Sequence, residues 1–116
     1  MALTEEQEKE WEFFQKIRKE NNFLSAFSVI KKFGVNSKNY NEEVPDFIGI
    51  ILFEDWVHSH GNEYFKVVNK KPTWFELWKI HDEFIKETEN ERHIYFEGYE
   101  PDDKGRPNCF KIMFGS

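Results

Sequence analysis

The stretch WFELWKIHDEFI, residues 74–85, decides the fold of this chain. Thr73 and Glu76 form a capping box at its start, because the hydroxyl accepts a hydrogen bond from a helix N–H while the glutamate reaches back to the cap. Six residues then recur at the spacing of an amphipathic helix: Trp74, Leu77, Trp78, His81, Phe84 and Ile85. The pattern predicts a helix whose apolar face packs on a sheet.

Two further helices are predicted before this one. Thr4 and Gln7 form another capping box, and a helix over residues 5–20 follows, with an apolar stripe of Trp11, Phe14 and Ile17. Apolar residues continue at three- and four-residue spacing after Asn22, and Gly34 is a typical helix end. A second helix is therefore expected over residues 23–33, and residues 35–46 are expected to form a loop or flap.

Two β-hairpins complete the prediction. Residues 47–53 form an apolar, isoleucine-rich run, and residues 64–68 are aromatic and β-branched. Residues 93–99 and 108–114 alternate in the same way around a loop with two prolines. The expected fold is α+β in two layers, with an antiparallel sheet of about four strands in two hairpins and three helices in the order ααββαββ, forming a single domain over residues 1–116.

Composition limits the function. The chain has 116 residues, 18% of them aromatic, and a net charge of −6. A phosphate backbone would repel this charge, so nucleic-acid binding is disfavoured and a protein partner with a basic surface fits better. The single cysteine, Cys109, has no partner for an internal disulfide, and the longest apolar run is too short for a bilayer. A cytoplasmic protein without membrane association is expected.

The densest group of potential metal ligands follows the first predicted strand. In extended backbone His58 and His60 would point the same way, and Glu54 or His81 would complete a shell for Zn²⁺ or Mn²⁺. A small metal-assisted hydrolase or nuclease is one interpretation of this group. The alternative is a polar hairpin tip, because neither paired cysteines nor a helical His-Glu-x-x-His accompanies these residues.

His81 admits two interpretations. It lies on the apolar stripe of the third predicted helix, so burial should lower its pKa. Beside Trp74 and Trp78 it would line a pocket between helix and sheet, as in a small-ligand sensor. The alternative is a core histidine with its hydrogen bonds satisfied.

The last hairpin offers a candidate binding face. Tyr95, Glu97 and Tyr99 alternate along one strand, and Lys111 lies on the next, while Tyr40 is the one large anchor of the preceding loop. Tyrosines give large contact area at small entropic cost. The alternative is an ordinary amphipathic outer face.

No glycine-rich phosphate loop or activated nucleophile is present in the sequence, so ATP- or NAD-dependent chemistry is not expected. The balance is against an enzyme and against a cofactor, and the metal-assisted hydrolase with Zn²⁺ or Mn²⁺ stays as the alternative. The sequence favours a small, acidic, non-catalytic interaction domain of bacterial, phage or mobile-element type. Such a domain would bind a protein partner or self-associate.

Overall fold

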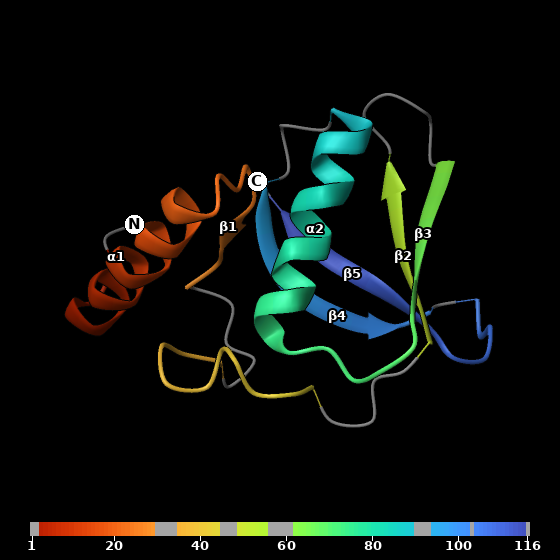
Figure 1. Ribbon diagram of the computed structural model, residues 1–116, viewed down its shortest axis with the longest axis horizontal. Coiled ribbons are helices and arrows are strands. Elements are labelled where there is room, and N and C mark those ends of the chain that lie inside the picture. Colours follow the sequence, from red (N-terminus) through yellow and green to blue (C-terminus); the bar gives the residue numbers. More distant parts are fainter. Residues whose placement is uncertain are drawn as a thin grey trace.

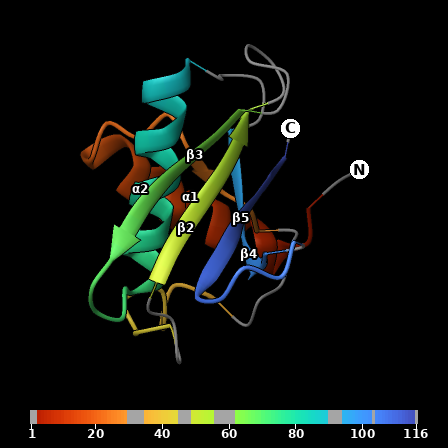
Figure 2. The same cartoon turned by 90° about the vertical axis from the view of Figure 1, so that its right-hand side faces the viewer.

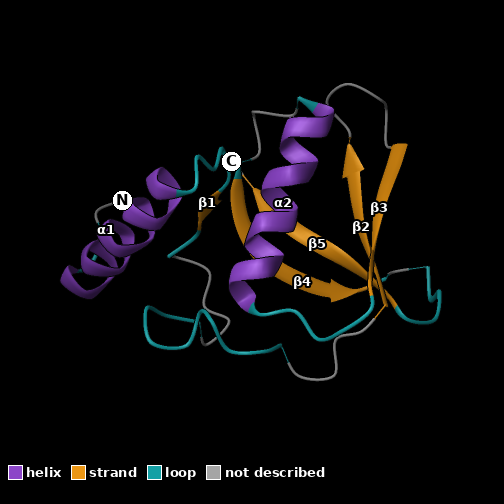
Figure 3. Cartoon of the chain, in the orientation of Figure 1, coloured by secondary structure: helices purple, strands orange, loops and turns teal. Residues whose placement is uncertain are grey.

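The computed structural model describes residues 3–29, 35–44, 49–55, 62–89, 94–102 and 104–115. Over these ranges two helices and five strands follow one another along the chain (Figures 1 and 3). Their bounds are α1 Glu5–Glu20, β1 Ala26–Phe27, β2 Gly49–Asp55, β3 Asn62–Val68, α2 Trp74–Thr88, β4 Tyr95–Pro101 and β5 Cys109–Gly115.

Both predicted capping boxes are present. The Thr4 hydroxyl accepts from the Gln7 N–H at 3.1 Å, and the Gln7 side chain accepts from the Thr4 N–H at 2.9 Å. Thr73 and Glu76 repeat this exchange at 3.1 and 3.0 Å. Each box satisfies two N–H groups that a helix start would otherwise leave free, which fixes where α1 and α2 begin.

The sheet is mixed and has the strand order β1-β4-β5-β2-β3. The two predicted hairpins form, because β2 pairs antiparallel with β3 and β4 pairs antiparallel with β5. The hairpins are joined by parallel pairing of β5 with β2, and β1 adds to β4 in parallel. α2 lies across one face of this sheet, with α1 beyond the β1 end (Figure 1).

The α+β class is confirmed, and three details of the prediction are wrong. The described chain has two helices, five strands and a mixed sheet. The expected helix over residues 23–33 is replaced up to residue 29 by an extended segment containing β1, and residues 30–33 lie outside the described part. The spacing of Phe23 and Phe27 suits a helix, yet Ala26 and Ser28 donate backbone hydrogen bonds to Ile94 and Phe96 instead. Tertiary pairing therefore overrides local periodicity here.

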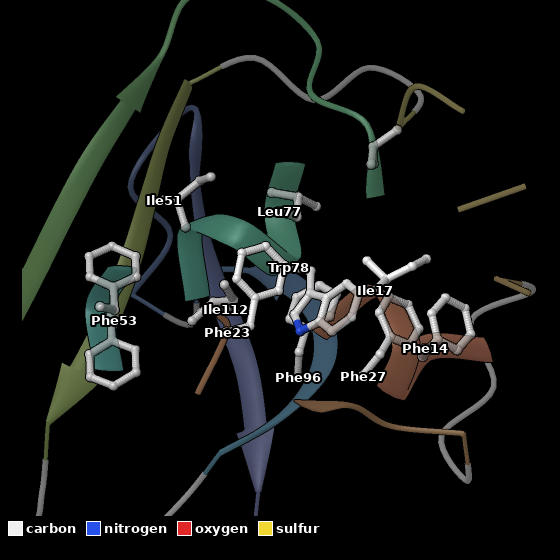
Figure 4. Packing of buried hydrophobic residues seen from close by; sticks show 12 residues of the cluster. Phe14, Ile17, Phe23, Phe27, Ile51, Phe53, Leu77, Trp78, Phe96 and Ile112 are labelled. Atoms are coloured by element: carbon white, nitrogen blue, oxygen red, sulfur yellow. The ribbon is translucent and has the colours of Figure 1, made fainter. Parts of the chain in front are cut away.

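Aromatic rings fill the space between the helices and the sheet. Trp78 is fully buried and meets Phe14, Phe23 and Phe27 edge-on, with ring centroids 5.0 to 5.9 Å apart (Figure 4). Phe14 stacks on Phe27 at 4.4 Å. These contacts join α1, β1 and α2 in one core, so packing on α2 holds the N-terminal elements in place.

Candidate interaction surface

The β2–β3 hairpin has one face toward α2 and one away from it. Phe53 stacks on Phe84 of α2 at 5.1 Å, which places Phe53 and its register partner Tyr64 on the helix side. Phe65 and Val67 alternate with Tyr64 along β3, so they lie on the opposite face. Their register partners Leu52 and Ile50 share that face. We call this side of the sheet the outer face.

Two large apolar side chains on the outer face are exposed to solvent. Phe65 is 66% exposed and Val67 is 61% exposed, although both belong to a regular strand. Figure 2 views the sheet from this side, with β3, β2 and β5 in front of the helices. Leu24 is the other large apolar residue that the described part exposes, at 37%, and it is isolated. Neighbouring exposed apolar side chains are typical of an interaction surface.

Lys66 lies between these two residues and points the other way. Its ammonium is 2.8 Å from Glu87 and 3.3 Å from Glu83 on α2, and 5.4 Å from the centroid of the Phe84 ring. Partial burial opposes the charge, but the two glutamates outweigh it and raise the pKa of Lys66. Lys66 therefore stays charged on the helix-facing side of β3, which is an end strand of the described sheet. An inward-pointing lysine opposes pairing of such a strand with another strand.

An ion-pair network stands beside Phe65. Arg106, on the loop between β4 and β5, donates two hydrogen bonds to the Glu63 carboxylate, at 2.9 and 2.8 Å. Its Nε and Nη2 also bind the Asp102 carboxylate, at 2.7 and 3.0 Å. Lys104 approaches Glu63 at 3.8 Å. The hydrogen bonds from Arg106 hold the pKa of Glu63 and of Asp102 below their usual values, so both acids stay ionised.

This network crosses the sheet. Glu63 is on β3, whereas Arg106 precedes β5, and β2 lies between those two strands. Glu63 shares the outer face with Phe65 by alternation, so the arginine reaches over that face. Leu52 on the same face is only 5% exposed. The outer face therefore combines an exposed apolar pair on β3 with a neutralised charge cluster at its border.

The structure separates the predicted tyrosine face. The β4–β5 register shifts between Phe96 and Gly98, so Glu97 is an extra residue in its strand. After this β-bulge Tyr99 pairs with the buried Ile112, and its ring meets Trp74 of α2 at 5.7 Å. Tyr99 thus belongs to the helix side. A bulge reverses the alternation that follows it, and the sequence pattern alone did not reveal one.

The other predicted binding residues are half-buried. Tyr95 lies 6.2 Å from the Trp11 ring of α1, centroid to centroid. Glu97 extends its carboxylate past Gly115, where a Cβ would lie 2.7 Å from Oε2. Lys111 pairs in register with Glu100 and Leu52, which places it on the outer face. Of the predicted set, Lys111 is thus the residue that accompanies Phe65 and Val67.

Tyr40 packs between the two helices. Its ring meets Phe13 of α1 at 5.3 Å and Phe75 of α2 at 6.2 Å, and its carbonyl accepts from the Phe75 N–H at 2.8 Å. The predicted loop around it is docked as well, because Val44 is fully buried and its N–H donates to the Pro72 carbonyl. Tyr40 and Val44 therefore attach residues 35–44 to the hydrophobic core.

His81 is fully buried at the centre of the protein. Its Nδ1 lies 2.7 Å from the Ser25 hydroxyl, and its ring stacks near Phe114 at 5.5 Å. Burial lowers its pKa to about 3, so the ring is neutral at pH 7. Trp78 is buried beside it and donates from Nε1 to the Ser25 carbonyl at 3.2 Å. A ligand would reach these side chains only if the core opened.

Asp82, to which the sequence pattern gave no role, anchors the segment before β1. Its Oδ1 accepts from the backbone N–H groups of Leu24 and Ser25, at 2.5 and 3.1 Å, and its Oδ2 binds Lys86 at 2.7 Å. The carboxylate therefore performs a structural task. The sequence pattern gave no sign of this role. His81 and Asp82 are neighbours in the chain, but His81 binds the Ser25 hydroxyl, whereas Asp82 binds the backbone N–H groups of Leu24 and Ser25.

The predicted metal site falls largely outside the described residues. His58 and His60 lie outside the described residues, and Glu54 is known only as a position in β2. Within the described ranges no group of three or more His, Cys, Asp or Glu residues is arranged to hold a metal ion.

A hollow of about 750 Å³ lies between the start of α1 and the segment after β1. Glu5, Glu6 and Glu10 line it together with Phe14 and Val35. The Glu10 carboxylate is already bonded to the Ser37 N–H and hydroxyl, at 2.9 and 3.0 Å. Residues 30–34, which connect its walls, lie outside the described part, so this hollow carries no functional assignment.

The sequence signal at Phe65 and Val67 supports the predicted strand over residues 64–68, but none of the predicted binding sites uses it. In YFKVV, residues 64–68, both faces of the strand are apolar except at Lys66. A strand at the end of a sheet with one helix-covered face must expose its other face. Recognising the outer pair required knowing which face α2 covers, and sequence alternation does not specify that.

None of the described helices has the length and apolar character needed to cross a membrane. No protein-family model, curated protein or solved structure matches this chain significantly.

Proposed function

We propose that this protein is a non-catalytic interaction domain that binds a protein partner through the outer face of its sheet. One observation carries the proposal: Phe65 and Val67 are 66% and 61% exposed, two positions apart on a regular strand. Exposing such side chains costs hydrophobic free energy, which burial against a partner recovers.

The surroundings support binding over a purely accidental exposure. Arg106 holds Glu63 with two hydrogen bonds beside the apolar pair, so the border is polar but has its charges matched. An apolar centre with a polar rim is the usual anatomy of a protein interface. The buried polar groups of Ser25 and Asp82, in contrast, are occupied by hydrogen bonds within the chain.

Site-specific photo-crosslinking tests the proposal. Benzoylphenylalanine replaces Phe65 in one variant and Leu24, which is exposed elsewhere, in a control. We expect covalent adducts between the residue at position 65 and a partner protein, and no such adducts from the residue at position 24. Excess untagged wild-type protein should suppress these adducts, and excess untagged Phe65→Gln protein should not.

Absence of any adduct at position 65 would contradict the proposal. The same conclusion would follow if Phe65→Gln competed as well as the wild type, because the apolar pair would then contribute nothing to recognition.

A further inference from the structure

We infer that the occupant of the outer face is a second copy of this chain, packed face to face across a two-fold axis. This inference rests on the proposed function and specifies its partner. Three features of the described structure lead to it: the state of the charges at the border, the position of Lys66, and the size of the face.

The border charges favour an identical partner. Arg106 and Lys104 balance Glu63 and Asp102 within one copy, so this cluster is neutral although the whole chain carries a net charge of −6. A partner chosen by charge would need an unmatched charge to address. Beside this cluster the described outer face exposes the apolar area of Phe65 and Val67, and an identical patch provides the same in return.

Lys66 decides how the two copies meet. Adding a second β3 edge to edge would bring strands together over a lysine that α2 already holds through Glu83 and Glu87. Such an inward lysine disfavours edge pairing. Packing of the two outer faces leaves Lys66 undisturbed, because it points to the opposite side, and it buries Phe65 and Val67 directly.

The dimensions of the face set the strength of the dimer. Strands β2 to β5 have seven residues each, and at about 3.3 Å per residue and about 4.8 Å between strands they span at most about 23 Å by about 19 Å, part of which Arg106 already covers. A standard protein interface covers about 800 Å² on each partner. The outer face is smaller, so a reversible dimer that depends on protein concentration is expected.

Sedimentation equilibrium of the full chain, from about 1 µM to about 500 µM, measures this association. We expect a monomer–dimer equilibrium in the wild type. Phe65→Gln and Val67→Thr should each raise the dissociation constant about tenfold or more. Leu24→Gln is the matched control, because it removes an exposed apolar side chain from another surface. Circular dichroism verifies that each variant is folded. Phe65→Gln and Val67→Thr are two independent tests of the interface, so the conclusion does not depend on either variant alone.

Salt dependence gives a second readout. Because the border charges are matched within each copy, the dissociation constant should not rise by more than about threefold between about 50 mM and about 500 mM salt, whereas screening of the net charge of −6 on each copy can only lower it. A larger rise would indicate an interface built on attractive charges and overturn face-to-face packing of the apolar pair.

The possible outcomes separate this inference from the proposed function. A monomer at every concentration overturns the second copy as partner, and adducts of position 65 with a different protein would still support the interaction domain. A dimer that neither Phe65→Gln nor Val67→Thr weakens overturns the inference by placing the interface elsewhere. A dimer weakened by both, with position 65 crosslinked to its own chain, supports both statements.

Discussion

The Ser25 hydroxyl and the His81 Nδ1 form a hydrogen bond of 2.7 Å in the middle of the core, where both residues are fully buried. Ser25 immediately precedes β1, and His81 is on α2, so this bond connects the N-terminal segment to the central helix. The second ring nitrogen, Nε2, is buried and has no hydrogen-bond partner in the described structure. The imidazole therefore stabilises the fold only in its neutral form.

The stability of the protein should fall as the pH falls below the ordinary pKa of histidine. Burial lowers the pKa of His81 from 6.5 to about 3, so between these values the unfolded chain binds a proton that the folded chain does not. The free energy of unfolding should drop by roughly 1 kcal/mol per pH unit between pH 6 and pH 5. Urea unfolding at several pH values measures this slope.

His81→Leu is the matched variant for this prediction. Leucine cannot titrate, so the slope between pH 6 and pH 5 should become markedly shallower than in the wild type. The variant also removes the partner of the Ser25 hydroxyl, which should lower stability at pH 7, where His81 is neutral, by about 1 kcal/mol. An unchanged slope would show that another group causes the acid sensitivity.

Asp82→Ala should destabilise the protein by about 3 kcal/mol or more. The carboxylate is 3% exposed and accepts from the backbone N–H groups of Leu24 and Ser25. Removing it leaves the buried Ser25 N–H and the partly buried Leu24 N–H without this partner, and a buried donor left unpaired costs about 1 to 3 kcal/mol. Thermal or urea unfolding at pH 7 gives the change.

Lys86→Ala separates the backbone contacts of Asp82 from its ion pair. Lys86 is 46% exposed, so losing it should cost about 1 kcal/mol or less. Equal losses in the two variants would mean that the ion pair, and not the anchoring of residues 24 and 25, accounts for the effect of Asp82.

Gly49→Ala should disrupt the pairing of β2 with β5. Gly49 has a φ of 152°, and a Cβ there would overlap the carbonyl oxygen of Asn108, which accepts from the Ile50 N–H at 2.8 Å. Backbone cannot move aside without breaking the β2–β5 pairing, so we expect a loss of about 3 kcal/mol or more. Urea unfolding of the variant at pH 7 measures this loss.

Gly105→Ala provides the comparison for Gly49→Ala. Gly105 also has a positive φ, of 71°, but a Cβ there meets no atom within 4 Å. Its cost should be only the conformational one, about 1 kcal/mol. If both substitutions had this small effect, the close approach of Asn108 to Gly49 would not matter for stability.

Lys66→Thr should make the protein prone to association through the β3 edge. Threonine suits a strand, and its substitution removes the charge that opposes edge pairing of β3. Light scattering over hours at high protein concentration should rise relative to the wild type. Lys70→Thr, just beyond β3, should behave like the wild type, and a similar rise in both variants would point to net charge as the cause.

The sequence predicted those elements whose signals are local. Capping boxes at Thr4 and Thr73 mark the starts of both helices because a cap involves residues three positions apart. The β2–β3 and β4–β5 hairpins were predictable because each pairs neighbours in the chain. The prediction for residues 23–29 was wrong because their extended conformation depends on Asp82 and on β4, which lie more than fifty residues away.

The candidate surface was predictable only in part. Lys111 lies on the outer face as a member of the predicted binding set, whereas Tyr99, from the same set, packs against Trp74. A one-residue bulge at Glu97 causes the difference, since it exchanges the faces of all later residues in β4. Phe65 and Val67 gained their importance only from the absence of a described helix over them.

The sequence by itself determined the α+β class, the two helix starts, the two hairpins and an aromatic core, because these follow from local spacing and composition. Only the tertiary structure decided the parallel joining of β5 to β2, the hydrogen bond of His81 to Ser25, and the exposure of Phe65 and Val67. The physical reason is that burial and strand partners depend on contacts between distant segments, and the sequence pattern specifies what each segment prefers without specifying which neighbour it meets.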